Sequence, residues 1–183
     1  MTTQEFDVFT LGFSNRTWAI TIEILESFEI KRLVDIRTVP GSRIAPQFNQ
    51  EHLQRALPAA GIEYVHMKQL GGLRKLKGND PANAGWRNAG FRAYADYMQT
   101  GEFRVALDEL IRLFLEMRTV YVCTEAVFWR CHRALVSDAL VASGYRAGHI
   151  LGIGRCQAHA ITSFARISGG RVAYPIPNPS LPI

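Results

Sequence analysis

The sequence lacks the long apolar run that a membrane-spanning helix needs, because no stretch approaches about 18 consecutive apolar residues. Residues 1–5 also lack the basic-then-apolar layout of a secretory signal. Cysteine is scarce: Cys123, Cys131 and Cys156 are an odd number in the C-terminal half and make a poor disulfide framework. We therefore expect a cytoplasmic protein in a reducing compartment, with no membrane partner.

Dense runs of lysine or arginine are also absent, although the formal net charge is +5. A mild positive charge favours an anionic partner through long-range attraction, but many proteins carry such a charge without binding nucleic acid. Apolar residues make up 48% and charged residues 20% of the 183 positions, which argues against disorder. This length suits one domain with a full hydrophobic core, so we expect a single domain over residues 1–183.

Short apolar runs alternate with stretches of helical spacing along the chain. Strands are predicted at residues 6–11, 31–36, 62–67, 119–123 and 145–151, and helices at residues 17–28, 49–60, 91–98, 103–114 and 131–143. This alternation predicts an α/β fold, a three-layer sandwich with helices on both faces of a mainly parallel, Rossmann-like sheet of about five strands.

Two segments interrupt the alternation. Residues 73–90 are rich in Lys, Gly, Asn and Pro, and such a long connection is usually a functional lid or partly disordered. Residues 174–183 carry four prolines and are expected to form an extended tail on the surface.

Residues of the types found in active sites follow the first four predicted strands. Ligands of open α/β sheets bind beyond the carboxyl ends of the strands, so these residues should share one edge. They are Ser14, Asn15 and Arg16; Asp35, Arg37 and Arg43; Gly71 and Gly72; and Cys123, Glu125, Cys131, His132 and Arg133. We therefore expect a ligand-binding cleft there, although such connections are polar in many proteins without a ligand.

Several motifs resemble those of a known family, in the same order along the chain. They occupy residues 11–16, 34–37, 70–72, 90–98, 123–125 and 129–133, and together they resemble domain-of-unknown-function family 488 (DUF488) from about residue 10 to residue 151. Phe13 stands where the family usually has histidine, and residues 73–86 resemble an insertion. The resemblance implies no assigned activity.

Arginines are the first candidates for binding a ligand, because their planar guanidinium groups fit phosphate or carboxylate. They could instead pair internally with Asp35, Asp96 and Glu125, but five arginines outnumber these three acids. The predicted ligand-binding residues are Ser14, Asn15, Arg16, Arg37, Arg43, Gly71, Gly72, Arg92 and Arg133.

Glu125 and Asp35 are the candidate general acid/base pair, since burial of Glu125 just past a strand end would suit proton exchange near neutral pH. The alternative is a structural Glu125 that pairs with an arginine. His132 falls in the first turn of a predicted helix, where the helix dipole favours a neutral imidazole.

Cys123 and Cys131 allow several interpretations. Arg130 follows Cys123 by seven positions, one more than in a phosphatase or rhodanese loop. A reactive thiolate is a second interpretation, because Arg130, His132 and Arg133 lie nearby in the sequence. Zinc could use both cysteines and His132, but their spacing is not a standard structural-zinc pattern, so we predict no metal and no cofactor. A fourth interpretation is that Cys123 is only a small buried side chain of the hydrophobic core, with no chemical role.

The residues together predict an enzyme with hydrolase- or transferase-like acid/base chemistry on a phosphate-bearing substrate, a nucleotide or nucleic acid. Its candidate catalytic residues are Asp35, Cys123, Glu125, Cys131 and His132. One alternative is a non-catalytic nucleic-acid-binding module that also uses the loop residues Arg74, Lys75, Lys77 and Arg87. Another is thiol or sulfur-transfer chemistry. The expected partner is an anionic small molecule or nucleic acid, and the sequence predicts no oligomeric state.

Overall fold

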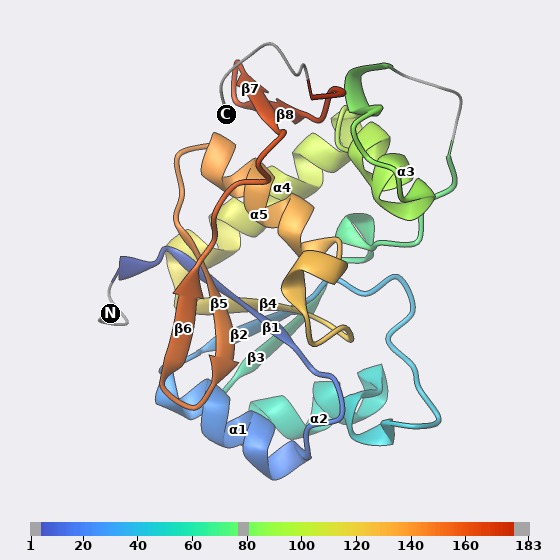
Figure 1. Ribbon diagram of the computed structural model, residues 1–183. Helices are drawn as coiled ribbons and strands as arrows, with labels where there is room; N and C mark the ends of the chain where they lie inside the picture. Colours follow the sequence, from blue (N-terminus) through green and yellow to red (C-terminus); the bar gives the residue numbers. More distant parts are fainter. Residues whose placement is uncertain (1–4, 77–80, 178–183) are drawn as a thin grey trace.

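The alternation of strand and helix becomes a three-layer α/β fold in the computed structural model, which describes residues 5–76 and 81–177 (Figure 1). The strands are β1 (Val8–Gly12), β2 (Arg32–Asp35), β3 (Glu63–His66), β4 (Thr119–Cys123), β5 (Ala147–Gly152), β6 (Arg155–Ala158), β7 (Arg166–Ser168) and β8 (Arg171–Ala173). The helices are α1 (Trp18–Ser27), α2 (Gln50–Ala59), α3 (Ala89–Tyr97), α4 (Gly101–Glu116) and α5 (Arg133–Ala142). The first four residues, Lys77 with the rest of 77–80, and the last six residues of the predicted tail lie outside the described residues.

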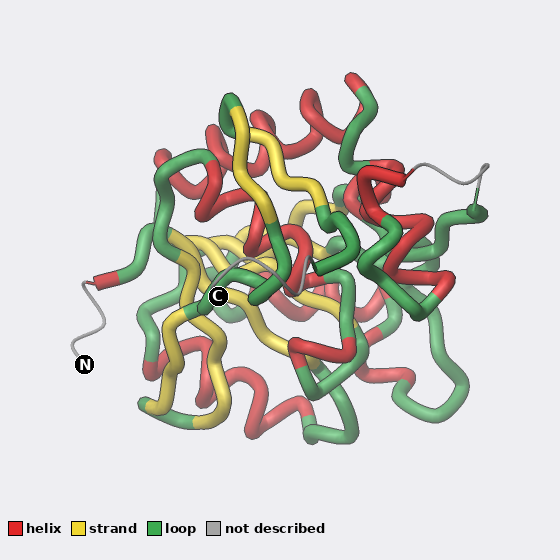
Figure 2. The backbone as a smooth tube through the Cα atoms, turned by 45° about the horizontal axis from the view of Figure 1, so that its top comes forward, coloured by secondary structure: helices red, strands yellow, loops and turns green. Residues whose placement is uncertain are grey.

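The main sheet has six strands in the order β3-β2-β4-β1-β5-β6. The pairs β2–β3, β2–β4, β1–β4 and β1–β5 are parallel, and only β6 runs antiparallel to its neighbour. The strands lie between two groups of helices in Figure 2. This arrangement confirms the predicted fold class, with six strands in place of about five.

Each face of the sheet has its own hydrophobic core, because successive side chains of a strand point to opposite faces. Val8 and Tyr121 belong to the cluster that includes α4 and α5, whereas Phe9 and Val120 pack with α1 and α2. Figure 1 shows α1 and α2 on one side of the sheet and α4 and α5 on the other. None of the helices in the described part of the chain is long and apolar enough to span a membrane.

Three C-terminal strands were not predicted, because they are short, largely exposed and lack an apolar run. A turn signal was nevertheless present. Gly169 and Gly170 connect β7 to β8 with φ angles of 54° and 71°, and a Gly-Gly pair of this kind is a signature of a two-residue hairpin.

Part of the predicted surface tail is buried in the protein, which corrects that expectation. Tyr174 is fully buried, and its hydroxyl donates a hydrogen bond of 2.8 Å to the Asp138 carboxylate. Its amide donates to the Ala82 carbonyl at 3.0 Å, and its own carbonyl accepts from the Gly85 amide at 2.8 Å. Residues 81–86 of the predicted insertion loop are therefore held against the C-terminal segment.

Candidate functional site

The carboxyl ends of three adjacent strands meet at one edge of the sheet. Gly12 at the end of β1 is in register with Cys123 at the end of β4, and Asp35 at the end of β2 is in register with Val122. The connections that leave these strands therefore start side by side, and this parallel register is what brings residues far apart in the sequence together.

A pocket with a volume of about 520 Å³ opens at this edge. The connections after β2, β3 and β4 supply most of its wall, and Phe91 and Tyr94 of α3 complete it. The candidate residues that line it are Arg37, Gly72, Cys123, Glu125, Cys131 and His132. Among the candidates, Ser14, Asn15, Arg16, Asp35, Arg43, Gly71, Arg92 and Arg133 are not part of its lining.

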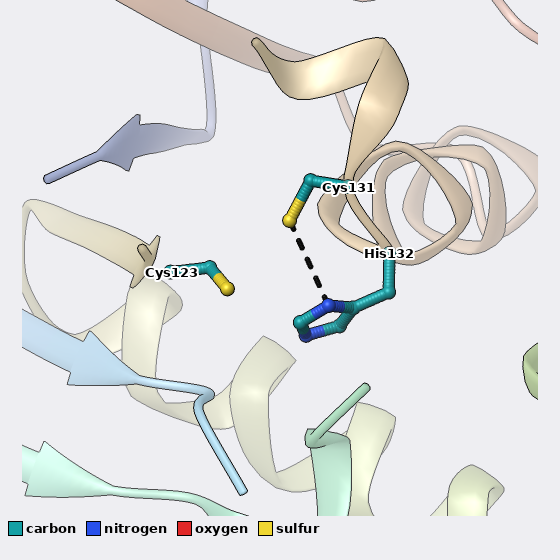
Figure 3. Close-up of side chains that lie close together, drawn as sticks. All are labelled: Cys123, Cys131 and His132. Atoms are coloured by element: carbon teal, nitrogen blue, oxygen red, sulfur yellow. Dashed lines mark hydrogen bonds between the residues drawn. The ribbon is translucent and has the colours of Figure 1, made fainter. Parts of the chain in front are cut away.

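Cys123, Cys131 and His132 form a compact group in the pocket wall (Figure 3). Cys123 ends β4, Cys131 follows the 3₁₀ turn Phe128–Arg130, and His132 occupies the N-cap position of α5. The two sulfur atoms and one ring nitrogen of His132 all lie within 4.8 Å of one another. These atoms, two sulfurs and one imidazole nitrogen, are the ligands that zinc and other soft cations prefer.

The orientation of His132 is fixed by its surroundings. Its Nε2 lies 3.4 Å from the Ile36 carbonyl, which can only accept, so Nε2 carries the hydrogen. The other ring nitrogen, Nδ1, faces Cys131 Sγ at 3.6 Å. The Tyr94 ring packs at 5.1 Å, and a Cβ atom on Gly72 would lie 2.4 Å from Nδ1. Gly72 thus leaves the space that the imidazole occupies.

The two thiols have pKa values that move in opposite directions. Interaction with the Cys123 thiol, and then with His132 and Arg133, lowers the pKa of Cys131. Interaction with Cys131, together with burial, raises the pKa of Cys123. Cys131 is therefore the more acidic of the two thiols, and Cys123 is the less acidic.

Arg133 holds the connection between β4 and α5 in place and does not reach the pocket. It is 1% exposed, and its guanidinium donates to Thr10 Oγ1 at 3.1 Å and to the carbonyls of Glu125 and Ala126. No carboxylate pairs with it within residues 5–76 and 81–177. Its buried charge therefore acts on the nearby thiol of Cys131.

Asp35 and Arg37 pair with each other inside the protein. The Arg37 guanidinium donates to both carboxylate oxygens of Asp35, and Tyr64 donates to the same carboxylate at 3.0 Å. Asp35 is fully buried, and Arg37 lines the pocket but is only 6% exposed. The candidate base is thus enclosed, and the candidate anion-binding charge of Arg37 is neutralised.

The remaining candidate arginines do not line the pocket. Arg16 is half-buried beside the Leu151 carbonyl at 3.5 Å, and burial lowers its pKa. Arg43 is exposed on the connection after β2, and Arg92 is half-buried on α3. The surplus of arginine that favoured an anion site is therefore spread over several surfaces.

The residues after β1 are also absent from the pocket lining. Ser14 has a φ of 51°, its amide donates to the Thr124 carbonyl at 2.7 Å, and its hydroxyl donates to Asn15 Oδ1. Phe13 is buried against Phe48, with ring centres 4.3 Å apart. The position where the family usually has histidine thus belongs to the hydrophobic core.

Glu125 is exposed, which corrects the expected burial of this residue. Its Oε1 accepts a hydrogen bond of 3.1 Å from the Val127 amide, and the residue lines the pocket.

Arg130 was not among the predicted ligand-binding residues, yet it is exposed and lines the same pocket. No carboxylate pairs with Arg130 in the part of the chain that the structure describes. Its position directly before Cys131 and His132 was the available signal.

The loop over residues 73–90 was expected to offer Arg74, Lys75, Lys77 and Arg87 to nucleic acid, but Arg74 is held by contacts within the protein. The Arg74 guanidinium packs over the Tyr97 ring at 3.5 Å and donates to the carbonyls of Gly71 and Gln69. Lys75 and Arg87 are exposed, and Lys77 lies outside the described residues.

Comparison with protein families gives one finding that covers most of the chain. The model of a family described as "Domain of unknown function DUF488" matches residues 18–140. A comparison with curated proteins gives no match. The matched range contains every residue that lines the pocket.

Proposed function

Because this chain belongs to the DUF488 family, a family of unknown function, we propose an activity from the site itself: an enzyme that acts on a phosphate-bearing substrate in the pocket at the carboxyl edge of the sheet. A nucleotide is the substrate class that we favour. In this enzyme Glu125 and Arg130 take part in the reaction, whereas Asp35 and Arg37 stabilise the fold.

The observation that carries this proposal is the mixture of chemical types in one cavity. Glu125, Arg130 and His132 line the same pocket, together with the two cysteines. A module that only binds nucleic acid would spread many like contacts over a surface, whereas an active site concentrates different groups in a concave site. The volume of about 520 Å³ lies in the range of small-molecule sites.

Each group has a role that follows from its position. The exposed guanidinium of Arg130 binds the phosphate, and the carboxylate of Glu125 exchanges a proton with the reacting group. Phe91 and Tyr94 give the pocket an aromatic wall, against which a base or a sugar can pack. His132 lies at the end of the same connection between β4 and α5, and it positions the substrate there.

Arg130→Ala is expected to weaken the binding of a nucleoside monophosphate by roughly 10–100-fold, because a hydrogen-bonded charge contributes about 1.5–3 kcal/mol. Isothermal titration calorimetry of both proteins measures this change. Arg43→Ala removes an exposed arginine outside the pocket and serves as the matched control, with an expected change below about twofold. Equal losses in the two variants would contradict binding in the pocket.

A non-catalytic nucleic-acid-binding module is the alternative function. Lys75, in the loop over residues 73–90, allows a test of it. If Lys75 contacts phosphate, Lys75→Ala should reduce the slope of log affinity against log salt by about one for an oligonucleotide. An unchanged slope, or no oligonucleotide binding at low salt, would count against the module.

A further inference from the structure

We propose that Cys123, Cys131 and His132 together bind one soft divalent cation, with zinc as the natural candidate, in the wall of the pocket. This inference deepens the proposed function, on which its catalytic meaning rests, because it gives the pocket a metal centre beside Glu125 and Arg130. The binding of the cation itself rests only on the three side chains.

The spacing of Cys131 Sγ and His132 Nδ1 matches an edge of a tetrahedral zinc site. With Zn–S near 2.3 Å and Zn–N near 2.0–2.1 Å, the sulfur and nitrogen corners of the tetrahedron are about 3.5 Å apart. Cys131 Sγ and His132 Nδ1 are 3.6 Å apart. Both sulfurs and the ring nitrogen fall within 4.8 Å of one another, and Figure 3 shows the three side chains pointing toward a shared space. One ion therefore reaches all three with small side-chain movements.

The imidazole is already oriented as a metal ligand. Histidines that bind metals donate their second ring N–H to a carbonyl or carboxylate, which fixes the tautomer and the ring plane. Here Nε2 faces the Ile36 carbonyl at 3.4 Å, while Nδ1 faces the sulfurs. The Gly72 backbone leaves no room for a side chain on that flank of the ring. Little reorganisation is thus needed when the ion binds.

The group has three protein ligands and no fourth. Among the described residues, no further His, Cys, Asp or Glu belongs to this cluster. Structural zinc sites are closed by four protein ligands, whereas catalytic sites have three and keep one position for water or substrate. The three residues line the pocket, so the fourth position opens toward the substrate space that Glu125 also lines. The layout is that of a catalytic centre.

Titration of the metal-free full chain with Co²⁺ tests the site, because thiolate ligands give cobalt a charge-transfer absorption that oxygen ligands do not. We expect saturation at one equivalent and displacement of the cobalt by Zn²⁺. Cys131→Ser and His132→Ala should each weaken cobalt binding by about 10–100-fold or more. Cys156→Ser is the matched control, because Cys156 lies on β6 and outside the cluster.

The absence of a charge-transfer band in the folded wild-type chain would overturn the metal site, as would an equal loss in Cys156→Ser. Circular dichroism of each variant shows whether it is folded, and the wild-type titration decides the matter if a variant is not. Cobalt binding at one equivalent without Arg130-dependent nucleotide binding would support the metal site and contradict the proposed function. Arg130-dependent nucleotide binding without cobalt binding would support the proposed function and contradict the metal site.

Discussion

Asp35→Ala is expected to lower the free energy of unfolding by about 3–5 kcal/mol, because it leaves the buried guanidinium of Arg37 without its counter-charge. Asp35 is fully buried and accepts hydrogen bonds from the backbone and side chain of Arg37 and from Tyr64. Urea denaturation, followed by circular dichroism, measures the change. The result also decides whether Asp35 has a structural role or acts as a general acid or base in the reaction.

Two comparisons sharpen this prediction. Asp108→Ala removes an exposed carboxylate that pairs with Arg104 at 3.5 Å, and its expected cost is about 0–1 kcal/mol. Replacing Arg37 by Met in the Asp35→Ala background should recover part of the loss, because no buried charge then remains. An Asp35→Ala protein as stable as the wild type would refute the structural role and return Asp35 to the catalytic candidates.

Glu125→Gln is expected to reduce turnover of the substrate by roughly 10²–10⁴-fold while the fold and phosphate binding persist. The glutamine keeps an oxygen that can accept from the Val127 amide but cannot act as an acid or base near neutral pH. Steady-state assays, begun with a panel of nucleotides, measure the loss. Glu51→Gln, an exposed acid in the first turn of α2, is the matched control.

Thermal melts of Glu125→Gln come before any assay, because they separate the chemical from the structural role. A large fall in melting temperature with unchanged nucleotide binding would remove Glu125 from the catalytic residues.

Thiol chemistry would reverse which substitution reduces turnover more. Cys131→Ser would then abolish turnover, and Glu125→Gln would only weaken it, because the thiolate would be the reacting group.

The parallel part of the fold could be predicted from local pattern alone. Residues 119–123 contain a run of apolar residues after Thr119, and the observed strand β4 has the predicted bounds. Parallel strands are buried on both faces and read as such runs, whereas edge strands do not. Strand β6 has the sequence Arg-Cys-Gln-Ala and pairs only with β5, so its hydrogen-bond partner and not its composition makes it a strand.

The location of the pocket was predictable, but its charges were not. The rule that ligands bind at the carboxyl ends of strands led to Cys123, Glu125, Cys131 and His132. A sequence cannot show which acid a given arginine reaches, so Arg37 was assigned to a ligand although it pairs with Asp35 two positions earlier. Cysteine spacing alone also could not show that Cys123, Cys131 and His132 come together, because their proximity depends on the tertiary fold.

A crystal structure of the protein with a nucleoside monophosphate is the most direct test of the central claim, that the pocket beside Glu125 and Arg130 is the active site. We predict density for the phosphate within about 2.7–2.9 Å of the Arg130 guanidinium. The rest of the nucleotide should fill the space between Phe91 and the connection after β4. Nucleotide density at Lys75 and Arg87 with an empty pocket would contradict the account.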